Sequence, residues 1–499
     1  MSTMTRAEAE DQLLELARED AKEAARNSLL GFTSWTKPNY NINWHHVLLA
    51  KKLELVAEGK IKRLLVRMPP RHGKTELVSR RWPAWLLGRN PNTQIIGCSY
   101  SATLAQSINR DVQRIMTSDE YRSLFGTLLS ERGVKGDSGG WLKNSDIFEI
   151  ASREYSGYYI AAGIGGSITG RGMTIGIVDD PIKNRKEANS KTFQKGIRDW
   201  WTSTFLTRGE GDEAIVVTLT SWSKKGLDNW ILEHAKETGE VWDVLDLTAI
   251  LDRPPIKGDP RKKGGALWPW KFNDKALKRI QLAIGSMDWA ALYQQRPAAA
   301  EGNIYKREWW KYFDPDNPPN FTAIILSWDT AFKKGEDNDF SVCYTVGVGP
   351  LGYYVIDRWK DKVRFPELKR QAIALCDAVT PTACLVEDKA SGQDLIAELE
   401  IETRIPIVPY KPNADKITRA HAVTPLIEAG RVFFPKRAPW LADALDNFSD
   451  FPNAEHDDDP DALNQALSYL RTHFAIPKQI VVKNIGKGNI IRGVRSTRR

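Results

Sequence analysis

The triplet Gly73-Lys74-Thr75 is the first feature of the sequence whose residue types could do chemistry. It ends the loop PPRHGKT, which follows the apolar run RLLVRM (63–68) and precedes the helical stretch ELVSRRWPAWLLG. In a strand–loop–helix of this kind, backbone N–H groups hold phosphates, the lysine reaches the β- and γ-phosphates, and the hydroxyl holds Mg²⁺. Met68 stands where the first glycine of the usual pattern would be. The residues predicted to bind a nucleotide are Arg71, His72, Gly73, Lys74, Thr75, Glu76 and Asp179.

Two adjacent acids, Asp179 and Asp180, end a second apolar run, MTIGIVDD (173–180). A carboxylate at the end of a parallel strand lies beside the phosphate loop, so we expect Asp179 to share the nucleotide's Mg²⁺ with Thr75. Asp180 takes the place where many ATPases carry a glutamate that polarises the attacking water. We predict it as the catalytic base, although an aspartate is one methylene shorter. The alternative is a pair of helix-capping acids.

Arg171 is the only cation in the glycine-rich stretch GIGGSITGRGMT before this strand. It suits an arginine finger for catalysis or a contact to DNA, and a plain loop arginine is the alternative. A third apolar run, AIVVTLTSW (214–222), ends in the small polar residues Thr220 and Ser221. These could sense the γ-phosphate and couple hydrolysis to movement, or simply form a turn.

A second group of acids lies far downstream. Asp329 ends the run FTAIILSWD, Glu387 ends TACLVE, and Asp458 and Asp461 begin an apolar-periodic helix three residues apart, hence on one side of it. Convergent carboxylates can hold two Mg²⁺ ions about 4 Å apart, which activate water and stabilise the leaving oxygen in phosphodiester cleavage. We therefore predict these four acids as catalytic metal ligands, with Mn²⁺ able to replace Mg²⁺. The neighbouring acids are expected to favour the helix N-terminus instead: Asp457 and Asp459.

The elements that must position these residues suggest two α/β domains. Alternating strands and helices over 31–245 are typical of a parallel sheet, here a RecA/ASCE-like P-loop ATPase domain. In 321–475, three antiparallel strands precede α, β, α, β, with acids on the first strand, the fourth strand and a late helix, the layout of an RNase H-like nuclease. We predict an N-terminal helix (1–30), a connecting subdomain (246–320) and a flexible basic tail (476–499) around them.

Length and composition agree with this division. A chain of 499 residues exceeds one ordinary core, and 41% hydrophobic with 27% charged residues is a globular mix. No run of about 18 apolar residues predicts a membrane span, and the polar, acidic start is unlike a secretory signal. A net charge of +8 favours a polyanionic partner. The four cysteines form no CxxC pair and are predicted to be buried free thiols.

A phosphate-loop ATPase followed by an RNase H-like nuclease in one chain resembles the large terminase subunit of tailed bacteriophages. The resemblance covers nearly the whole chain, from about Tyr40 to Leu470. The stretches that carry it are PPRHGKTE, GSITGRG before GIVDDP, TLTSW, DWAALYQQRP (288–297), SWDTAF, LVEDKASG and HDDDPDA.

The resemblance implies a motor that hydrolyses ATP to move double-stranded viral DNA into a procapsid through the portal. The nuclease would cut concatemeric DNA when packaging starts and ends. It further implies a small terminase subunit as partner and a ring of copies, often five, on the portal. The protein would act in the host bacterial cytoplasm and transiently on the procapsid, with no membrane. Arg171 matches the position of a trans-acting arginine finger, whereas Met68 and Asp180 depart from the common pattern.

Two other functions are compatible with parts of this pattern. One is a helicase-like DNA-remodelling ATPase whose RNase H-like domain only binds DNA, which would not cleave DNA in Mg²⁺ or Mn²⁺. The other is a portal-associated scaffold with a relict nucleotide fold, which would not turn over ATP.

Overall fold

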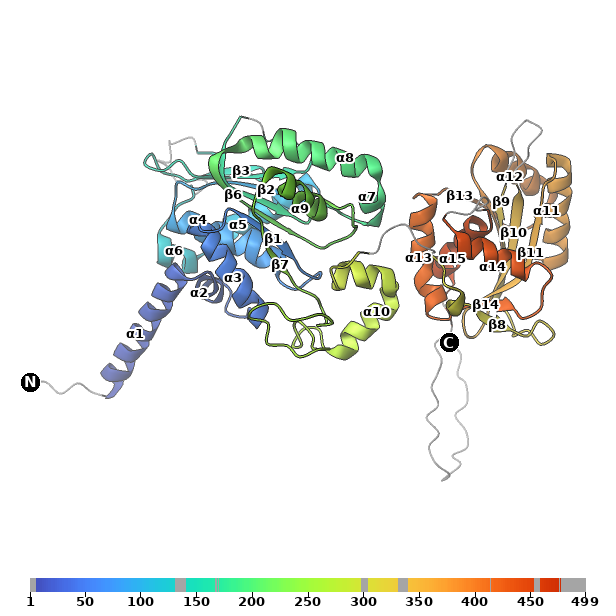
Figure 1. The fold of residues 1–499 in the computed structure, drawn as a ribbon, viewed down its shortest axis with the longest axis horizontal. Helices are drawn as coiled ribbons and strands as arrows, with labels where there is room; N and C mark the ends of the chain where they lie inside the picture. The colour runs from blue at the N-terminus through green and yellow to red at the C-terminus, as the bar shows by residue number, and fades with distance from the viewer. Residues whose placement is uncertain are drawn as a thin grey trace, which may run out of the picture. The chain divides into compact units, whose positions relative to one another are not determined.

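The computed structural model describes residues 6–130, 141–166, 168, 170–297, 304–330, 340–412, 414–452, 458–474 and 476. It divides into two compact units, Met1–Ala300 and Glu301–Arg499. Each unit has a seven-stranded sheet with helices on its faces, which confirms the predicted α/β class (Figure 1). The finer boundaries remain predictions, and the basic tail at 476–499 lies outside the described residues except for Ile476.

The sheet of the first unit has the order β3-β4-β2-β5-β6-β1-β7. Neighbouring strands are parallel except for β3 with β4. The strands are β1 (Arg63–Arg67), β2 (Gln94–Ser99), β3 (Ile147–Glu149), β4 (Tyr158–Gly163), β5 (Met173–Asp179), β6 (Gly209–Leu219) and β7 (Asp243–Asp246). The parallel register brings the ends of β1, β5 and β6 to one edge of the sheet.

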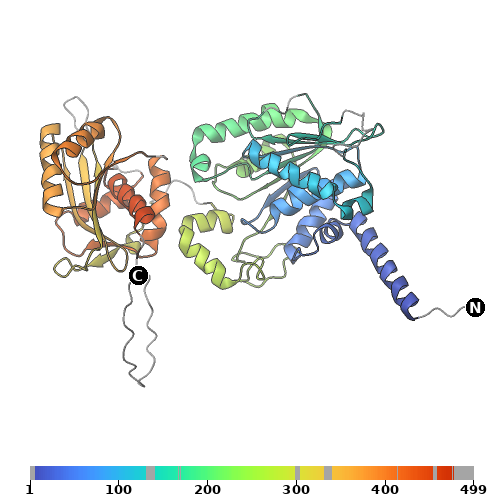
Figure 2. The ribbon, with the colours of Figure 1, turned by 180° about the vertical axis from the view of Figure 1, so that it is seen from behind.

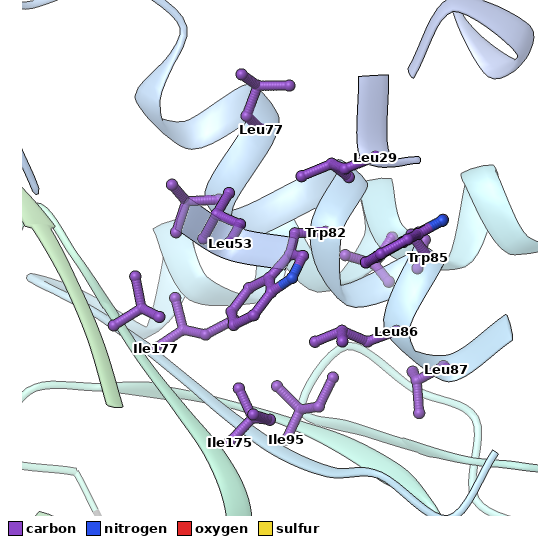
Figure 3. Close-up of a cluster of buried hydrophobic side chains, with 14 of the residues drawn as sticks. Leu29, Leu53, Leu77, Trp82, Trp85, Leu86, Leu87, Ile95, Ile175 and Ile177 are labelled. Carbon is purple, nitrogen blue, oxygen red and sulfur yellow. The ribbon is translucent and has the colours of Figure 1, made fainter. Parts of the chain in front are cut away.

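Helices cover both faces of this sheet (Figures 1 and 2). One face packs on α2 (Leu29–Thr36), α3 (Trp44–Ala57), α4 (Trp82–Arg89), α5 (Ala102–Met116) and α6 (Asp119–Phe125), and the other on α8 (Lys191–Trp200) and α9 (Leu227–Thr238). Successive strand residues alternate between the two cores: Leu64 and Val66 belong to the first, Leu65 to the second. Both faces are buried, which explains the continuous apolar runs of the sequence. Figure 3 shows Trp82 between the helices and Ile95, Ile175 and Ile177 of the sheet.

The described residues of the first unit also form α1 (Arg6–Asn27), α7 (Arg185–Asn189) and α10 (Asp274–Asp288). Helix α10 continues into a π-helical turn, Trp289–Tyr293, inside the DWAALYQQRP stretch. Residues 246–297 of the predicted connecting segment thus belong to the same compact unit as the phosphate loop, whereas its described residues 304–320 belong to the second unit.

The second unit has a mixed sheet of order β13-β12-β9-β10-β11-β14-β8. The strands are β8 (Lys311–Phe313), β9 (Ala323–Asp329), β10 (Ser341–Val348), β11 (Tyr353–Asp361), β12 (Ala383–Glu387), β13 (Ile407–Tyr410) and β14 (Val432–Pro435). β9, β10 and β11 are antiparallel as predicted, whereas β12 pairs with β9 in parallel.

Helices α11 (Phe365–Val379) and α12 (Ala390–Glu402) cover one face of this second sheet. Helices α13 (Lys416–Glu428), α14 (Leu441–Asp450) and α15 (Asp458–His473) cover the other. All four cysteines are free and buried, as predicted. No helix among the described residues is long and apolar enough to cross a membrane.

Candidate active sites

The phosphate loop joins β1 to the helical segment that begins at Lys74 and continues into α4. Gly73 has a φ of 99°, and a Cβ added there would lie 2.6 Å from both His46 Nε2 and Tyr40 Oη. Only glycine fits this position, because it tolerates the left-handed backbone and leaves room for both rings. Arg71 also has a positive φ, 64°. The loop is therefore a tightly specified turn even though Met68 replaces its usual first glycine.

Lys74 is the centre of the first site. Its side chain is only 4% exposed, and Nζ donates to the Met68 carbonyl at 2.8 Å and to Thr220 Oγ1 at 2.6 Å. Asp180 Oδ1 lies 3.5 Å from the same nitrogen. Thr220 follows the end of β6, so the strand end TLTSW does lie beside the loop lysine, as the hypothesis of a phosphate sensor requires.

Asp179 is the last residue of β5 and is buried. Ser79 Oγ donates to its Oδ2 at 2.7 Å, whereas Oδ1 has no well-formed hydrogen bond within the described residues. Burial, and then the charge of Asp180, raise the pKa of Asp179 to about 6, while Ser79, Lys74 and Thr75 act in the opposite direction. A buried carboxylate oxygen without a full set of partners, next to Thr75, fits a divalent cation.

An open cavity of about 480 Å³ lies over this strand edge. Arg71, Lys74, Thr75 and Asp180 line it on the loop side. Most of the remaining lining residues are aromatic or basic, and Glu76 is the second acid beside Asp180: Lys37, Tyr40, Glu76, Arg80, Trp268 and Lys271. Cations therefore outnumber acids around the cavity, as an anionic ligand of nucleotide size requires.

Two residues predicted to bind the nucleotide, His72 and Glu76, use their side chains in contacts within the protein. The His72 ring is buried and stacks on Phe272 with centroids 4.6 Å apart, and burial lowers its pKa to about 3. The His72 ring is therefore neutral, and its packing on Phe272 fixes the loop. Glu76 lies at the rim of the cavity in ion pairs with Lys37 at 2.9 Å and Arg81 at 3.0 Å. Burial would raise the pKa of Glu76, but these cations lower it below its ordinary value.

Arg171 does not line the cavity of its own chain. Its Nη2 pairs with Glu149 Oε1 at 2.8 Å, and its guanidinium lies 5.0 Å from the centroid of the Tyr158 ring. Arg171 precedes β5 and Asp179 ends it, so the length of the strand, roughly 20 Å, separates them. A catalytic role for Arg171 is therefore geometrically possible only toward another copy.

A polar relay next to Lys74 was not identified from the sequence. The buried Asp228 accepts from Ser221 Oγ at 2.8 Å and pairs with Arg67 Nε at 2.8 Å. The Ser221 N–H donates to Oε1 of Gln295 at 3.1 Å. The stretch DWAALYQQRP could have indicated this relay, because it contains Gln295. Gln295 binds Ser221, and Ser221 directly follows Thr220, the partner of Lys74.

The second candidate site lies at one end of the second sheet. Asp329 and Glu387 are the last residues of β9 and β12, which are parallel neighbours. Helix α15 packs on β9 through the hydrogen bonds from Ser327 Oγ to the Ala462 carbonyl at 2.8 Å and from Gln465 Nε2 to the Trp328 carbonyl at 3.3 Å. This packing brings the first turn of α15, and hence the two remaining predicted acids, to the end of the two strands.

The predicted acids are near enough to repel one another. Burial raises the pKa of Asp329 well above its usual range, and the charges of Asp461, Glu387 and Asp458 raise it further. As the side chains stand, no three His, Cys, Asp or Glu residues in the described part of the chain are close enough to hold an ion. The donor set nevertheless fits Mg²⁺ or Mn²⁺, because convergent carboxylates are the ligands these cations prefer and their mutual repulsion is what a cation relieves.

Asp459 has a different function from its neighbours. It is fully buried and accepts hydrogen bonds from Arg358 Nη2 at 2.9 Å, Lys360 Nζ at 2.8 Å, Tyr344 Oη at 2.8 Å and Asn447 Nδ2 at 2.7 Å. The sequence predicts a helix-capping acid here, but the structure shows that the side chain anchors α15 to β10, β11 and α14. Asp457 lies outside the described residues.

Two family models match the chain. Residues 66–311 match "Terminase large subunit, T4likevirus-type, N-terminal", and residues 326–470 match "Terminase RNaseH-like domain". Together they span both candidate sites in the order that the sequence predicts. The chain belongs to the terminase large-subunit family. It is a viral DNA-packaging motor with ATPase and endonuclease activities.

Solved structures of other large terminases are similar to the chain. That of a thermophilic bacteriophage in complex with ADP has 11% identity and a TM-score of 0.46, covering 85% of this chain and 98% of that one. The large terminase of bacteriophage HK97 has 13% identity and a TM-score of 0.33, covering 84% and 94%. The large terminase nuclease of the thermophilic phage G20c with bound magnesium has 14% identity and a TM-score of 0.27, covering 34% and 98%. No curated protein sequence matches this terminase.

Proposed function

We propose that the cavity at Lys74 is the ATP site of the motor and that the carboxylates around Asp329 form its nuclease site. The observation that carries the first assignment is that Lys74 and Asp180 meet at one open cavity, with Thr220 bonded to Lys74 and the buried Asp179 next to Asp180. The second rests on acids from β9, β12 and α15 that repel one another at one sheet end.

In the motor, each residue at the cavity has its own role in ATP binding or hydrolysis. Lys74 leaves Thr220 and the Met68 carbonyl to pair with the β- and γ-phosphates, which changes the hydrogen bonds at the end of β6. Thr75 and Asp179 would hold Mg²⁺, which neutralises phosphate charge. Asp180 is partly exposed, whereas Asp179 is buried, so Asp180 is the acid that orients the attacking water and accepts its proton.

The relay from Ser221 to Gln295 gives that change a route into the connecting segment. Thr220 and Ser221 are adjacent, so release of Lys74 from Thr220 alters the strand end to which Gln295 is bound. Arg185 makes a second link between the strand end and the connecting segment. It donates to the Trp222 carbonyl at 2.7 Å and pairs with Asp288. Movement of the connecting segment is the mechanical output that we assign to ATP turnover.

In the nuclease, Asp329, Glu387, Asp458 and Asp461 would hold Mg²⁺ or Mn²⁺, which activates water and stabilises the leaving oxygen. Asp329 makes no ion pair with a described residue and so offers its oxygens most directly. Asp459 keeps the first turn of α15 in place through its four buried bonds.

The partners that we assign are double-stranded viral DNA, the portal, the procapsid and a small terminase subunit. The motor would act in the host bacterial cytoplasm as a homo-oligomeric ring, with five copies the expected number, transiently bound to the portal. A ring also gives Arg171 its only route to catalysis, because it cannot reach the ATP cavity of its own chain.

Packaging with purified procapsids, small subunit, ATP and linear DNA tests this function. We expect the wild type to protect DNA from added nuclease, and Lys74→Ala to protect none. Trp270→Ala serves as the control and should protect DNA as the wild type does, since its side chain is 69% exposed and does not line the cavity. Protection by the Lys74 variant at the wild-type level would exclude this cavity as the motor's ATP site.

A further inference from the structure

Two cations already occupy one carboxylate of the proposed nuclease site. Asp461 Oδ1 accepts from Arg419 Nη2 at 3.0 Å, and Asp461 Oδ2 pairs with Lys416 Nζ at 2.8 Å. Both cations come from α13, which packs directly on α15. Both oxygens of a predicted metal ligand are therefore paired with positive charge supplied by the chain.

The two cations differ in how firmly they are held. The Arg419 side chain is 6% exposed and lies between Asp461 and Glu387, whose Oε1 is 3.9 Å from Nη1. The Lys416 side chain is 43% exposed, and it sits in the first turn of α13 on a flexible stem. Moving Arg419 would leave buried charges unpaired, whereas Lys416 can turn into water at little cost.

We propose that Lys416 is an exchangeable counter-ion of the nuclease site, which holds Asp461 in place until a divalent cation displaces it, while Arg419 stays. The proposal rests on the function assigned to the four carboxylates. Lys416 is the cation that partly offsets the repulsion on Asp329. The positive charge of a divalent cation replaces that of Lys416 at the same oxygen, so the two compete. Cleavage then requires a metal concentration high enough to displace the lysine, and below that concentration the nuclease is inactive.

The competition predicts the sign of a substitution. Lys416→Met keeps most of the stem and removes the charge, so a cation no longer has to displace it. We expect the nuclease site to bind Mn²⁺ roughly tenfold more tightly, the effect of one unit charge on a divalent ion over a few ångströms at water-like dielectric. A lysine that only supported the fold would, when removed, leave the affinity unchanged or weaken it.

Lys411→Met is the matched control. Lys411 is 81% exposed and pairs with Asp388 at 3.3 Å, the residue after Glu387. The variant removes the same charge near the same strand end but from an acid outside the proposed ligand set. We expect its Mn²⁺ affinity to change by less than about twofold, because an exposed charge at this range is screened.

The experiment is a Mn²⁺ titration of the full chain without nucleotide, with free Mn²⁺ followed by electron paramagnetic resonance. Asp329→Asn identifies the portion of the binding that belongs to the nuclease site. If the wild type and Asp329→Asn bind Mn²⁺ identically, the proposed metal site itself is wrong. If they differ, but Lys416→Met binds no more tightly than the wild type, the site stands and the counter-ion role of Lys416 is refuted.

A second readout uses stability in place of binding. Without metal, Lys416→Met leaves the carboxylates less compensated, so the variant should melt below the wild type in EDTA. Saturating Mn²⁺ should raise its Tm by more than it raises that of the wild type, because at the same Mn²⁺ concentration the stabilisation by a bound ligand grows with the logarithm of its affinity. An equal rise in both proteins would contradict the proposal.

Discussion

Replacing Asp179 by asparagine should make the nucleotide-free protein more stable while abolishing its ATPase activity. Burial and Asp180 raise the pKa of Asp179 from 3.8 in the unfolded chain to about 6 in the fold. For an acid whose folded pKa is raised, stability is complete below the unfolded value and is lost as pH rises through the folded value. Above pH 6 the ionised carboxylate thus costs about 3 kcal/mol, since each pKa unit corresponds to about 1.4 kcal/mol.

Asparagine removes this charge and keeps an oxygen to accept from Ser79, which now donates to Asp179 at 2.7 Å. Integrating the two pKa values gives a gain of about 3 kcal/mol at pH 7.5 but only about 1 kcal/mol at pH 4.5, where the folded wild type is already protonated. At about 2 °C per kcal/mol for a unit of this size, the Tm should rise by about 6 °C and about 2 °C respectively.

The assay is thermal unfolding in EDTA without nucleotide at both pH values. Asp212→Asn is the control, because Asp212 is 95% exposed and the same change there should leave the Tm unaltered. If the variant's Tm does not rise at pH 7.5, or rises equally at pH 4.5, then Asp179 is not a buried carboxylate whose charge is left uncompensated without a cation.

Three further substitutions test other parts of the structure. Gly73→Ala should abolish ATP turnover and destabilise the fold, because its Cβ meets two rings at 2.6 Å. Gly126→Ala has a positive φ of 76° as well but open space, so it should cost only the backbone strain, about 1–3 kcal/mol, seen by urea unfolding. Arg358→Met should lower the unfolding free energy of the second unit by about 3–5 kcal/mol, since it leaves a buried acid short of its main cation, whereas the 68% exposed Arg437→Met should cost under about 1 kcal/mol. Arg171→Ala should bind ATP normally yet lose turnover in assembled rings, and unchanged turnover there would exclude a finger acting between copies.

Much of the two sites was predictable because their chemistry is local in sequence. Lys74 and Thr75 lie in one loop, and Asp179, Asp329 and Glu387 each end an apolar run, which parallel pairing turns into a shared sheet edge. Such patterns need no knowledge of distant contacts.

The parts that could not be predicted depend on residues far apart in the chain. Asp459 is paired with Arg358, a residue 101 positions earlier, and nothing in HDDDPDA distinguishes it from the acids beside it. Gln295 binds Ser221 from 74 positions away. Lys416 and Arg419 reach Asp461 only because α13 packs on α15. Tertiary packing, which no local pattern encodes, assigns these side chains to structural, coupling and counter-ion functions.

The central claim is that one chain carries two independent active sites. It is tested most directly by measuring DNA-stimulated ATP hydrolysis and Mg²⁺- or Mn²⁺-dependent cleavage of plasmid DNA on the same preparations of wild type, Lys74→Ala and Asp329→Ala. We expect the Lys74 variant to cut DNA without hydrolysing ATP, and the Asp329 variant to hydrolyse ATP without cutting. Loss of both activities in either variant while the protein remains folded, or cleavage that persists without Asp329, would contradict the account.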